Sequence, residues 1–133
     1  MNVEPPIRGQ DVHGEGYYGA PRGSRTHNGV DMACCPDSLI KATRRGKVTK
    51  IGYPYNPEDA KKGFLRYVQV TDVDGFDHRY FYVRPKVRVG DEVEVDGVIG
   101  KAQDMDQIYP GITPHIHYEV KLFGSFVDPR RFL

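Results

Sequence analysis

The sequence lacks three features that would assign it quickly to a protein class. Its 133 residues contain no apolar run close to the roughly 20 residues that a membrane-spanning helix needs. Its net charge is +1, so no excess of one sign points to nucleic acid or to a membrane surface. The two cysteines, Cys34 and Cys35, are adjacent, a spacing that suits neither a disulfide framework nor a complete structural zinc site. We therefore expect no membrane span, no disulfide scaffold and no nucleic-acid partner.

The amino-terminal segment also lacks the apolar core of a Sec signal peptide, and it carries acidic residues such as Glu4 and Asp11 instead. A chain of this length is typical of one domain. We expect residues 1–20 to form a loop-rich segment and residues 21–133 to form the folded domain.

Glycine and proline, in contrast, are abundant, at 15 and 10 residues. This share favours turns over long helices, and an aromatic content of 11% is too high for a disordered chain. The segments expected to be strands are Leu39–Ala42, Gly46–Ile51, Phe64–Thr71, His78–Val83, two pieces within Val87–Gly100, and His115–Val120. Asp74 and Gly75 form a turn signal of the hairpin type. We predict a mainly β domain whose antiparallel sheet folds into a sandwich or a partly closed barrel.

Two of the five histidines stand two residues apart in the last predicted strand. Because alternate residues of a strand project from the same face, His115 and His117 point together, and Glu119 follows in the same row. Two imidazoles on one face of a rigid strand suit zinc binding or acid–base chemistry. The pair alone does not distinguish such a site from two exposed histidines.

A second candidate cluster is formed by His27 and Asp31. A fully extended chain would hold these residues roughly 13 Å apart, too far for both to reach one zinc ion, but Gly29 between them permits a bend. Together with one histidine of the strand, they would supply three protein ligands and leave a fourth position to water, as in catalytic zinc sites. A surface histidine beside an Asx-type turn at Asp31 is the alternative.

Several motifs follow one another in an order that resembles a known family. An arginine precedes the His-x-x-x-Asp motif in the segment from Pro21 to Gly52, and an apolar-x-Ala…Gly-x-Val stretch follows it. Next come the motifs RYFYV and VGDEVEVDGVIG. The histidine pair lies near the end of the chain, in the motif PHIHYE. From about Pro21 to Leu133, the sequence resembles the lysostaphin-type (LytM-like) zinc metallopeptidases. The resemblance implies the mainly β fold of that family.

The resemblance also implies a function. It identifies His27, Asp31 and His117 as ligands of one zinc ion per chain, and His115 as the catalytic histidine beside the metal. The implied reaction is hydrolysis of peptide cross-links in bacterial peptidoglycan, outside the cytoplasm or in the cell wall. A phage-borne wall hydrolase, released as a lysin or carried in the virion, is a context that fits.

One position departs from the family pattern. The family carries a second catalytic histidine in a Tyr-x-His-apolar strand, and Tyr82 stands at that place here. A phenol with a pKa near 10 is a poor base at neutral pH but can donate a hydrogen bond to a developing oxyanion. We therefore predict that Tyr82 is a catalytic hydrogen-bond donor and that proton transfer falls to His115. His78 lies four residues upstream, roughly 13 Å away along a strand, and is not expected to substitute.

The same change occurs in one branch of the family, the leukocyte-derived chemotaxins of vertebrates. The chain resembles this branch in the spacing of Phe81, Tyr82 and Pro85, and in a Tyr-Pro-Gly-Ile run, residues 109–112, before His115. Members of this branch are secreted signalling proteins regarded as zinc-bound but not as peptidases. The resemblance thus implies an alternative function, a non-catalytic zinc-bearing binding or signalling module that uses the former substrate groove for recognition.

Overall fold

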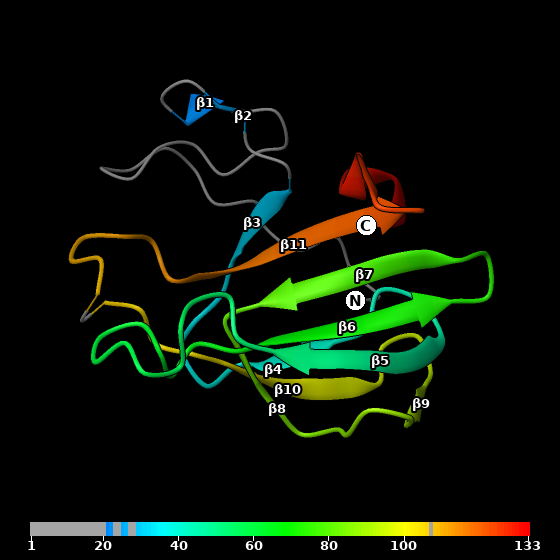
Figure 1. Cartoon of the computed structure of the whole chain (residues 1–133), viewed down its shortest axis with the longest axis horizontal. Helices are drawn as coiled ribbons and strands as arrows, with labels where there is room; N and C mark the ends of the chain where they lie inside the picture. Colours follow the sequence, from blue (N-terminus) through cyan, green and yellow to red (C-terminus); the bar gives the residue numbers. More distant parts are fainter. Residues whose placement is uncertain (1–20, 23–24, 27–28, 107) are drawn as a thin grey trace.

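The computed structural model of the protein describes residues 21–22, 25–26, 29–106 and 108–133 (Figure 1). The predicted loop-rich segment, residues 1–20, lies outside the described residues, and so does His27. The division of the chain at residue 21 therefore stays a prediction. The described part of the chain holds no helix with the length and hydrophobicity to span a bilayer.

Twelve short strands and one 3-10 helix make up the regular structure of the described residues. They are β1 (Pro21–Arg22), β2 (Arg25–Thr26), β3 (Val30–Ala33), β4 (Leu39–Lys41), β5 (Gly46–Gly52), β6 (Tyr67–Asp72), β7 (Phe76–Phe81), β8 (Val83–Pro85), β9 (Glu92–Val93), β10 (Val98–Ala102), β11 (His115–Leu122), β12 (Ser125–Val127) and the 3-10 helix η1 (Pro129–Phe132).

The strands form two main antiparallel sheets (Figure 1). The larger sheet has the order β12-β11-β7-β6-β5-β9, and the smaller has the order β4-β10-β8. One edge of β11 is shared, since β3 pairs with its first half and β12 with its second half. β1 and β2 pair with each other in a separate two-stranded sheet. This architecture confirms the predicted mainly β, antiparallel fold, with sheets that do not close into a barrel.

The hydrophobic core lies between the two sheets. Ile40 and Ile99 contribute from the smaller sheet, and Val68 and Ile116 from the larger one, all at most 1% exposed. Burying a side chain of this size stabilises the fold by about 1.5–3 kcal/mol. Because one face of each strand in the larger sheet is committed to this core, the alternate residues face outward, and the candidate site lies among them.

The predicted hairpin at Asp74 and Gly75 is confirmed, and it joins β6 to β7. Gly75 has a φ of +88°, a conformation that residues with a Cβ rarely adopt. The hairpin fixes the register of the two central strands, and β11 extends the sheet from β7.

Several strand ends differ from the sequence prediction, and two of these differences have a clear physical cause. β6 begins at Tyr67 rather than Phe64, because the side chain of Gln103 accepts from the Arg66 amide and donates to the Phe64 carbonyl. β7 ends before Tyr82, whose φ of +70° breaks the extended conformation.

The adjacent cysteines are both free thiols, as expected from their spacing. Cys35 is exposed, whereas Cys34 is partly buried. Burial raises the pKa of the Cys34 thiol to about 11, so it stays protonated at neutral pH and is a poor nucleophile.

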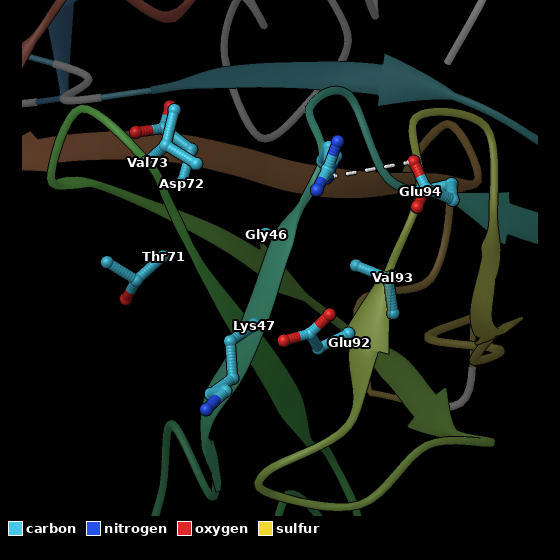
Figure 2. A pocket seen from close by; sticks show the side chains of 9 residues that line it. Gly46, Lys47, Thr71, Asp72, Val73, Glu92, Val93 and Glu94 are labelled. Carbon is cyan, nitrogen blue, oxygen red and sulfur yellow. Dashed lines mark ion pairs between the residues drawn. The ribbon is translucent and has the colours of Figure 1, made fainter.

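A pocket lies between β5, β6 and β9, at the opposite edge of the larger sheet from β3 (Figure 2). Three carboxylates, Asp72, Glu92 and Glu94, and two basic side chains, Arg45 and Lys47, line it. Arg45 and Glu94 form an ion pair of 3.9 Å, and both side chains are largely exposed. This mixture of acidic and basic side chains indicates no particular ligand, and the predicted site residues that the structure describes do not line the pocket.

Candidate functional site

Asp31 and His117 lie directly opposite each other where β3 pairs with β11. Val30 and Met32 on either side of Asp31 belong to the core, so strand alternation turns Asp31 to the outer face of the sheet. There the Asp31 Oδ1 atom lies 2.9 Å from Nδ1 of His117. The structure thus brings together two predicted metal ligands that are far apart in the sequence.

His115 lies on the same strand and is 5% exposed. Its Nδ1 atom lies 2.7 Å from the carbonyl oxygen of Thr113. Because a carbonyl can only accept, Nδ1 carries a hydrogen, and Nε2 is the nitrogen that gains or loses a proton. Nε2 lies 3.6 Å from Oδ2 of Asp31. The carboxylate of Asp31 therefore lies between the two histidines of β11, with one oxygen toward each.

The second nitrogen of His117 faces another carboxylate. Nε2 lies 3.0 Å from Oε1 of Glu119, two residues further along β11. Burial lowers the pKa of His117, but the hydrogen bonds to Asp31 and Glu119 outweigh burial and raise it to about 9. In the metal-free protein, the imidazole is therefore held by an acceptor at each nitrogen.

Glu119 is 7% exposed and is itself paired. Its Oε2 atom accepts from Nη1 of Arg79 at 3.0 Å, and Arg79 lies directly opposite it on β7. A charge-assisted hydrogen bond of this kind is stronger than one between neutral groups and offsets the cost of burying the carboxylate. The two oxygens of Glu119 thus bind one partner each, Arg79 and His117.

Tyr82 reaches the site because of its backbone conformation. Regular alternation along β7 would direct its side chain to the core with Tyr80, but the φ of +70° at Tyr82 interrupts that alternation. Its ring lies 5.9 Å from that of His115, with an interplanar angle of 88°. Burial raises the pKa of Tyr82 well above 10, and the neighbouring hydroxyl of Tyr55 raises it further. The phenol therefore stays protonated at neutral pH and is able to donate a hydrogen bond.

Two loops meet beside Tyr82, residues 53–63 and residues 103–114. The hydroxyls of Tyr55 and Tyr109, one from each loop, lie 3.2 Å apart. Nζ of Lys62 lies 5.0 and 5.3 Å from the centres of these two rings. The aromatic rings and hydroxyl groups of Tyr55 and Tyr109 therefore lie next to Tyr82, at one side of the site.

Gly29 lies tightly against His117. A Cβ at this position would lie 2.4 Å from the carbonyl oxygen of Tyr118 and 2.8 Å from Cε1 of the His117 ring. No side chain fits in that space, so the glycine allows β3 to begin next to the imidazole. The bend that the sequence predicts between His27 and Asp31 lies partly outside the described residues, so it stays a prediction. The structure shows that Gly29 is needed for a close approach of the backbone to His117.

The donor set fits a zinc ion. Carboxylate oxygen and imidazole nitrogen are ordinary zinc ligands, and at about 2.0–2.1 Å from a tetrahedral ion they lie roughly 3.3 Å apart. The facing atoms of Asp31 and His117, at 2.9 Å, are within a few tenths of an ångström of that separation. The third predicted ligand, His27, lies outside the described residues. Among the described residues, no group of three or more histidine, cysteine or acidic side chains suits one metal ion.

His78 lies on the opposite face of the sheet from His117. It is fully buried, with Nε2 2.8 Å from Oδ2 of Asp72 and Nδ1 2.7 Å from the hydroxyl of Tyr118. Thr43 joins the same buried network through the Tyr118 hydroxyl at 2.8 Å. His78 therefore has a place in the core, and it does not take the position of the family's second catalytic histidine.

Residues 25–129 match the model of Peptidase family M23. The chain belongs to this family. The match includes every residue of the geometry above, from Gly29 to Glu119, and it confirms the resemblance found in the sequence.

The M23 chain is also similar to curated vertebrate proteins. It is 32% identical to leukocyte cell-derived chemotaxin-2 of Bos taurus over 113 residues, which cover 85% of this chain and 72% of the relative. It is 31% identical to myeloid protein 1 of Gallus gallus over 122 residues, 89% of this chain and 36% of that protein.

Solved structures share the fold of this M23 chain. The catalytic domain of a prophage-encoded M23 protein, EnpA of Enterococcus faecalis, superposes with a TM-score of 0.70 at 21% identity, covering 98% of this chain and 93% of that one. The catalytic domain of the antimicrobial peptidase lysostaphin from Staphylococcus simulans gives a TM-score of 0.65 at 25% identity, with coverages of 92% and 90%.

Sequence reasoning on this M23 chain missed one contributor to the site. Arg79 had no signal, because its pairing with Glu119 depends on the register between β7 and β11. Tyr55 was a candidate for the wall of the groove because it is an aromatic residue in a loop, but its contact with Tyr82 depends on the folded chain. Glu119 had a signal, since it continues the row of His115 and His117 at a spacing of two residues.

Proposed function

We propose that the protein is a zinc metalloendopeptidase that hydrolyses peptide cross-links of bacterial peptidoglycan, and that it acts where peptidoglycan lies, outside the cytoplasm. The observation that carries the proposal is the position of Asp31 between His115 and His117, on one face of the sheet, within a peptidase family match. Such a set offers metal ligands and a proton-transferring imidazole within one site.

In this proposal, Asp31, His117 and His27 hold one zinc ion per chain. A bound zinc ion would supply Lewis-acid polarisation of the scissile carbonyl and of a water molecule. Because Thr113 fixes Nδ1 of His115 as a donor, Nε2 is the atom that takes a proton during attack and returns it to the leaving amine. The protonated hydroxyl of Tyr82 donates to the oxygen of the scissile carbonyl as charge develops there.

The test compares the zinc-loaded wild type with a His115→Ala variant on purified peptidoglycan and on glycine- and alanine-rich peptides. We expect cleavage by the wild type and a loss of about 10²–10⁴-fold in the variant, because the general base is gone. Zinc content, measured on both proteins, should stay at one ion per chain, since His115 is not a proposed ligand. Equal inactivity of the two zinc-loaded proteins would overturn the proposal.

A second function, a zinc-bearing recognition module without peptidase activity, is favoured by one specific observation. Tyr82 occupies the place of a catalytic histidine, and the chain is 32% identical to leukocyte cell-derived chemotaxin-2 over 85% of its length. For this function we expect zinc binding and no cleavage. Cleavage that depends on His115 would exclude it.

A further inference from the structure

Arg79 is held firmly at one end of a line of polar contacts on the outer face of the sheet. Its guanidinium carbon lies 4.9 Å from the ring centre of Tyr67 and 5.1 Å from that of Phe81. Its Nη1 atom donates to Glu119, and the Arg79 side chain is 17% exposed. Stacking on two rings and pairing with a carboxylate leave the guanidinium little freedom to turn.

The line continues to the proposed metal ligand. Arg79 donates to one oxygen of Glu119, whose other oxygen faces Nε2 of His117 at 3.0 Å. An ionised carboxylate only accepts hydrogen bonds, so this contact requires a hydrogen on Nε2. When His117 is neutral, its other nitrogen, Nδ1, then carries the lone pair, and Nδ1 is the atom that faces Asp31.

We propose that Arg79 is a positioning residue that acts through Glu119: it holds the Glu119 carboxylate turned toward Nε2 of His117, so that Nδ1 is presented to the metal. The inference rests on the proposed zinc site. Partners of this kind behind a metal-binding histidine fix its tautomer, and their loss commonly costs 10–100-fold in metal affinity.

The role of Arg79 follows from charge as well as geometry. Glu119 is nearly buried, and without Arg79 its carboxylate would lack the cation that offsets the cost of burial and would be free to turn toward the metal. The acceptor at Nε2 of His117 would then be lost. Arg79 prevents this because it occupies the oxygen that does not face the histidine.

Glu119→Gln makes the sharpest test. Arg79 would draw the amide oxygen of Gln to itself, and the amide nitrogen would then donate toward Nε2 of His117. This reverses the tautomer, because Nδ1 would carry the hydrogen. We expect zinc affinity, measured by competition with a chromophoric chelator, to fall by about 10–100-fold.

Arg79→Gln is expected to weaken zinc binding by about 10-fold, and Arg79→Lys, which keeps the charge, to recover part of that loss. Arg84→Gln is the matched control, because Arg84 forms an exposed ion pair with Asp37 at 3.3 Å on a different sheet. It should bind zinc like the wild type. If Arg79 acts through Glu119, adding Arg79→Gln to Glu119→Gln should cause little further loss.

Nitrogen-15 NMR of zinc-loaded wild type supplies a readout that needs no variant. The expected spectrum shows His117 with a hydrogen on Nε2 and the metal on Nδ1. A hydrogen on Nδ1 would overturn the inference, as would an Arg79→Gln protein that is folded and binds zinc as tightly as the Arg84→Gln control. If the wild type itself binds no zinc, the proposed function fails, and this inference fails with it.

Discussion

The ring of Tyr82 meets that of His115 edge-on, with centroids 5.9 Å apart and planes at 88°. This contact places a phenol beside the proposed general base, where the M23 pattern of Tyr-x-His-apolar has an imidazole. A protonated phenol donates a hydrogen bond but does not accept a proton at neutral pH. In the proposed mechanism, proton transfer therefore falls to His115 alone, and Tyr82 contributes a hydrogen bond to the oxyanion.

Tyr82→His tests whether the missing imidazole limits the rate. A second acid–base group beside His115 should raise kcat for peptide cleavage by about 10²-fold or more. The measurement is single-substrate kinetics on a defined peptide at fixed zinc loading. An active variant of an inactive wild type would support the recognition module, whereas an unchanged rate would contradict the proposed importance of this position.

Tyr82→Phe tests the hydrogen bond itself. If the hydroxyl of Tyr82 stabilises the oxyanion, kcat should fall by about 10²–10³-fold with little change in KM. Tyr55→Phe is the control, because it removes the neighbouring hydroxyl without removing that of Tyr82. Equal kcat values for the wild type and Tyr82→Phe would show that Tyr82 only fills space beside His115.

The features of this site that could be predicted from the sequence are those that depend on residues close together in the chain. The row of His115, His117 and Glu119 follows from strand alternation alone, and the hairpin at Asp74 and Gly75 follows from local turn chemistry. Each of these features is determined by a few neighbouring residues, and the structure contains both the row and the hairpin.

Other features depend on the folded chain. The positive φ of Tyr82 runs against the preference of a bulky residue, so no local pattern indicates that its side chain leaves the core face. The pairing of Arg79 with Glu119 is set by the register of two strands 40 residues apart in sequence. Long-range register is fixed by the whole core, and a single sequence does not reveal it.

Zinc should stabilise the folded protein through Asp31. A ligand that binds only the native state adds about 4 kcal/mol to the free energy of unfolding at 1,000 times its Kd. We expect a clear rise in Tm on adding zinc to metal-free wild type and to His115→Ala, but little or none for Asp31→Ala. Thermal denaturation with and without a chelator measures this, and an undiminished rise in Asp31→Ala would remove that residue from the ligand set.

The buried histidine of the core predicts a pH dependence. Burial lowers the pKa of His78 below its ordinary value near 6.5, although Asp72 partly opposes the effect. Below pH 6.5 the unfolded chain therefore binds more protons than the folded one at this position, and the free energy of unfolding falls as pH decreases toward 5. The charged and titratable groups that face His78 are Asp72, Asp77, Arg44 and Tyr118.

His78→Gln checks this assignment by urea denaturation of metal-free protein between pH 5 and 6.5. The variant should be less stable at pH 6.5, because it loses buried hydrogen bonds, but its stability should depend less on pH. The contribution of one histidine has a slope of at most about 1.4 kcal/mol per pH unit. Parallel curves for the variant and the wild type would assign the acid sensitivity to other groups.

Gly29→Ala should damage both the fold and the metal site. The added Cβ would lie 2.4 Å from the Tyr118 carbonyl oxygen and 2.8 Å from the His117 ring, so β3 or the imidazole must shift. Overpacking of this kind costs about 1–3 kcal/mol, and even a small shift of His117 away from Asp31 should weaken zinc binding.

Gly75→Ala is the control, because its Cβ meets open space and only the φ of +88° is unfavourable. Urea denaturation and zinc titration of both variants should show loss of zinc affinity in Gly29→Ala alone; equal affinities would mean that β3 yields without moving its site residues.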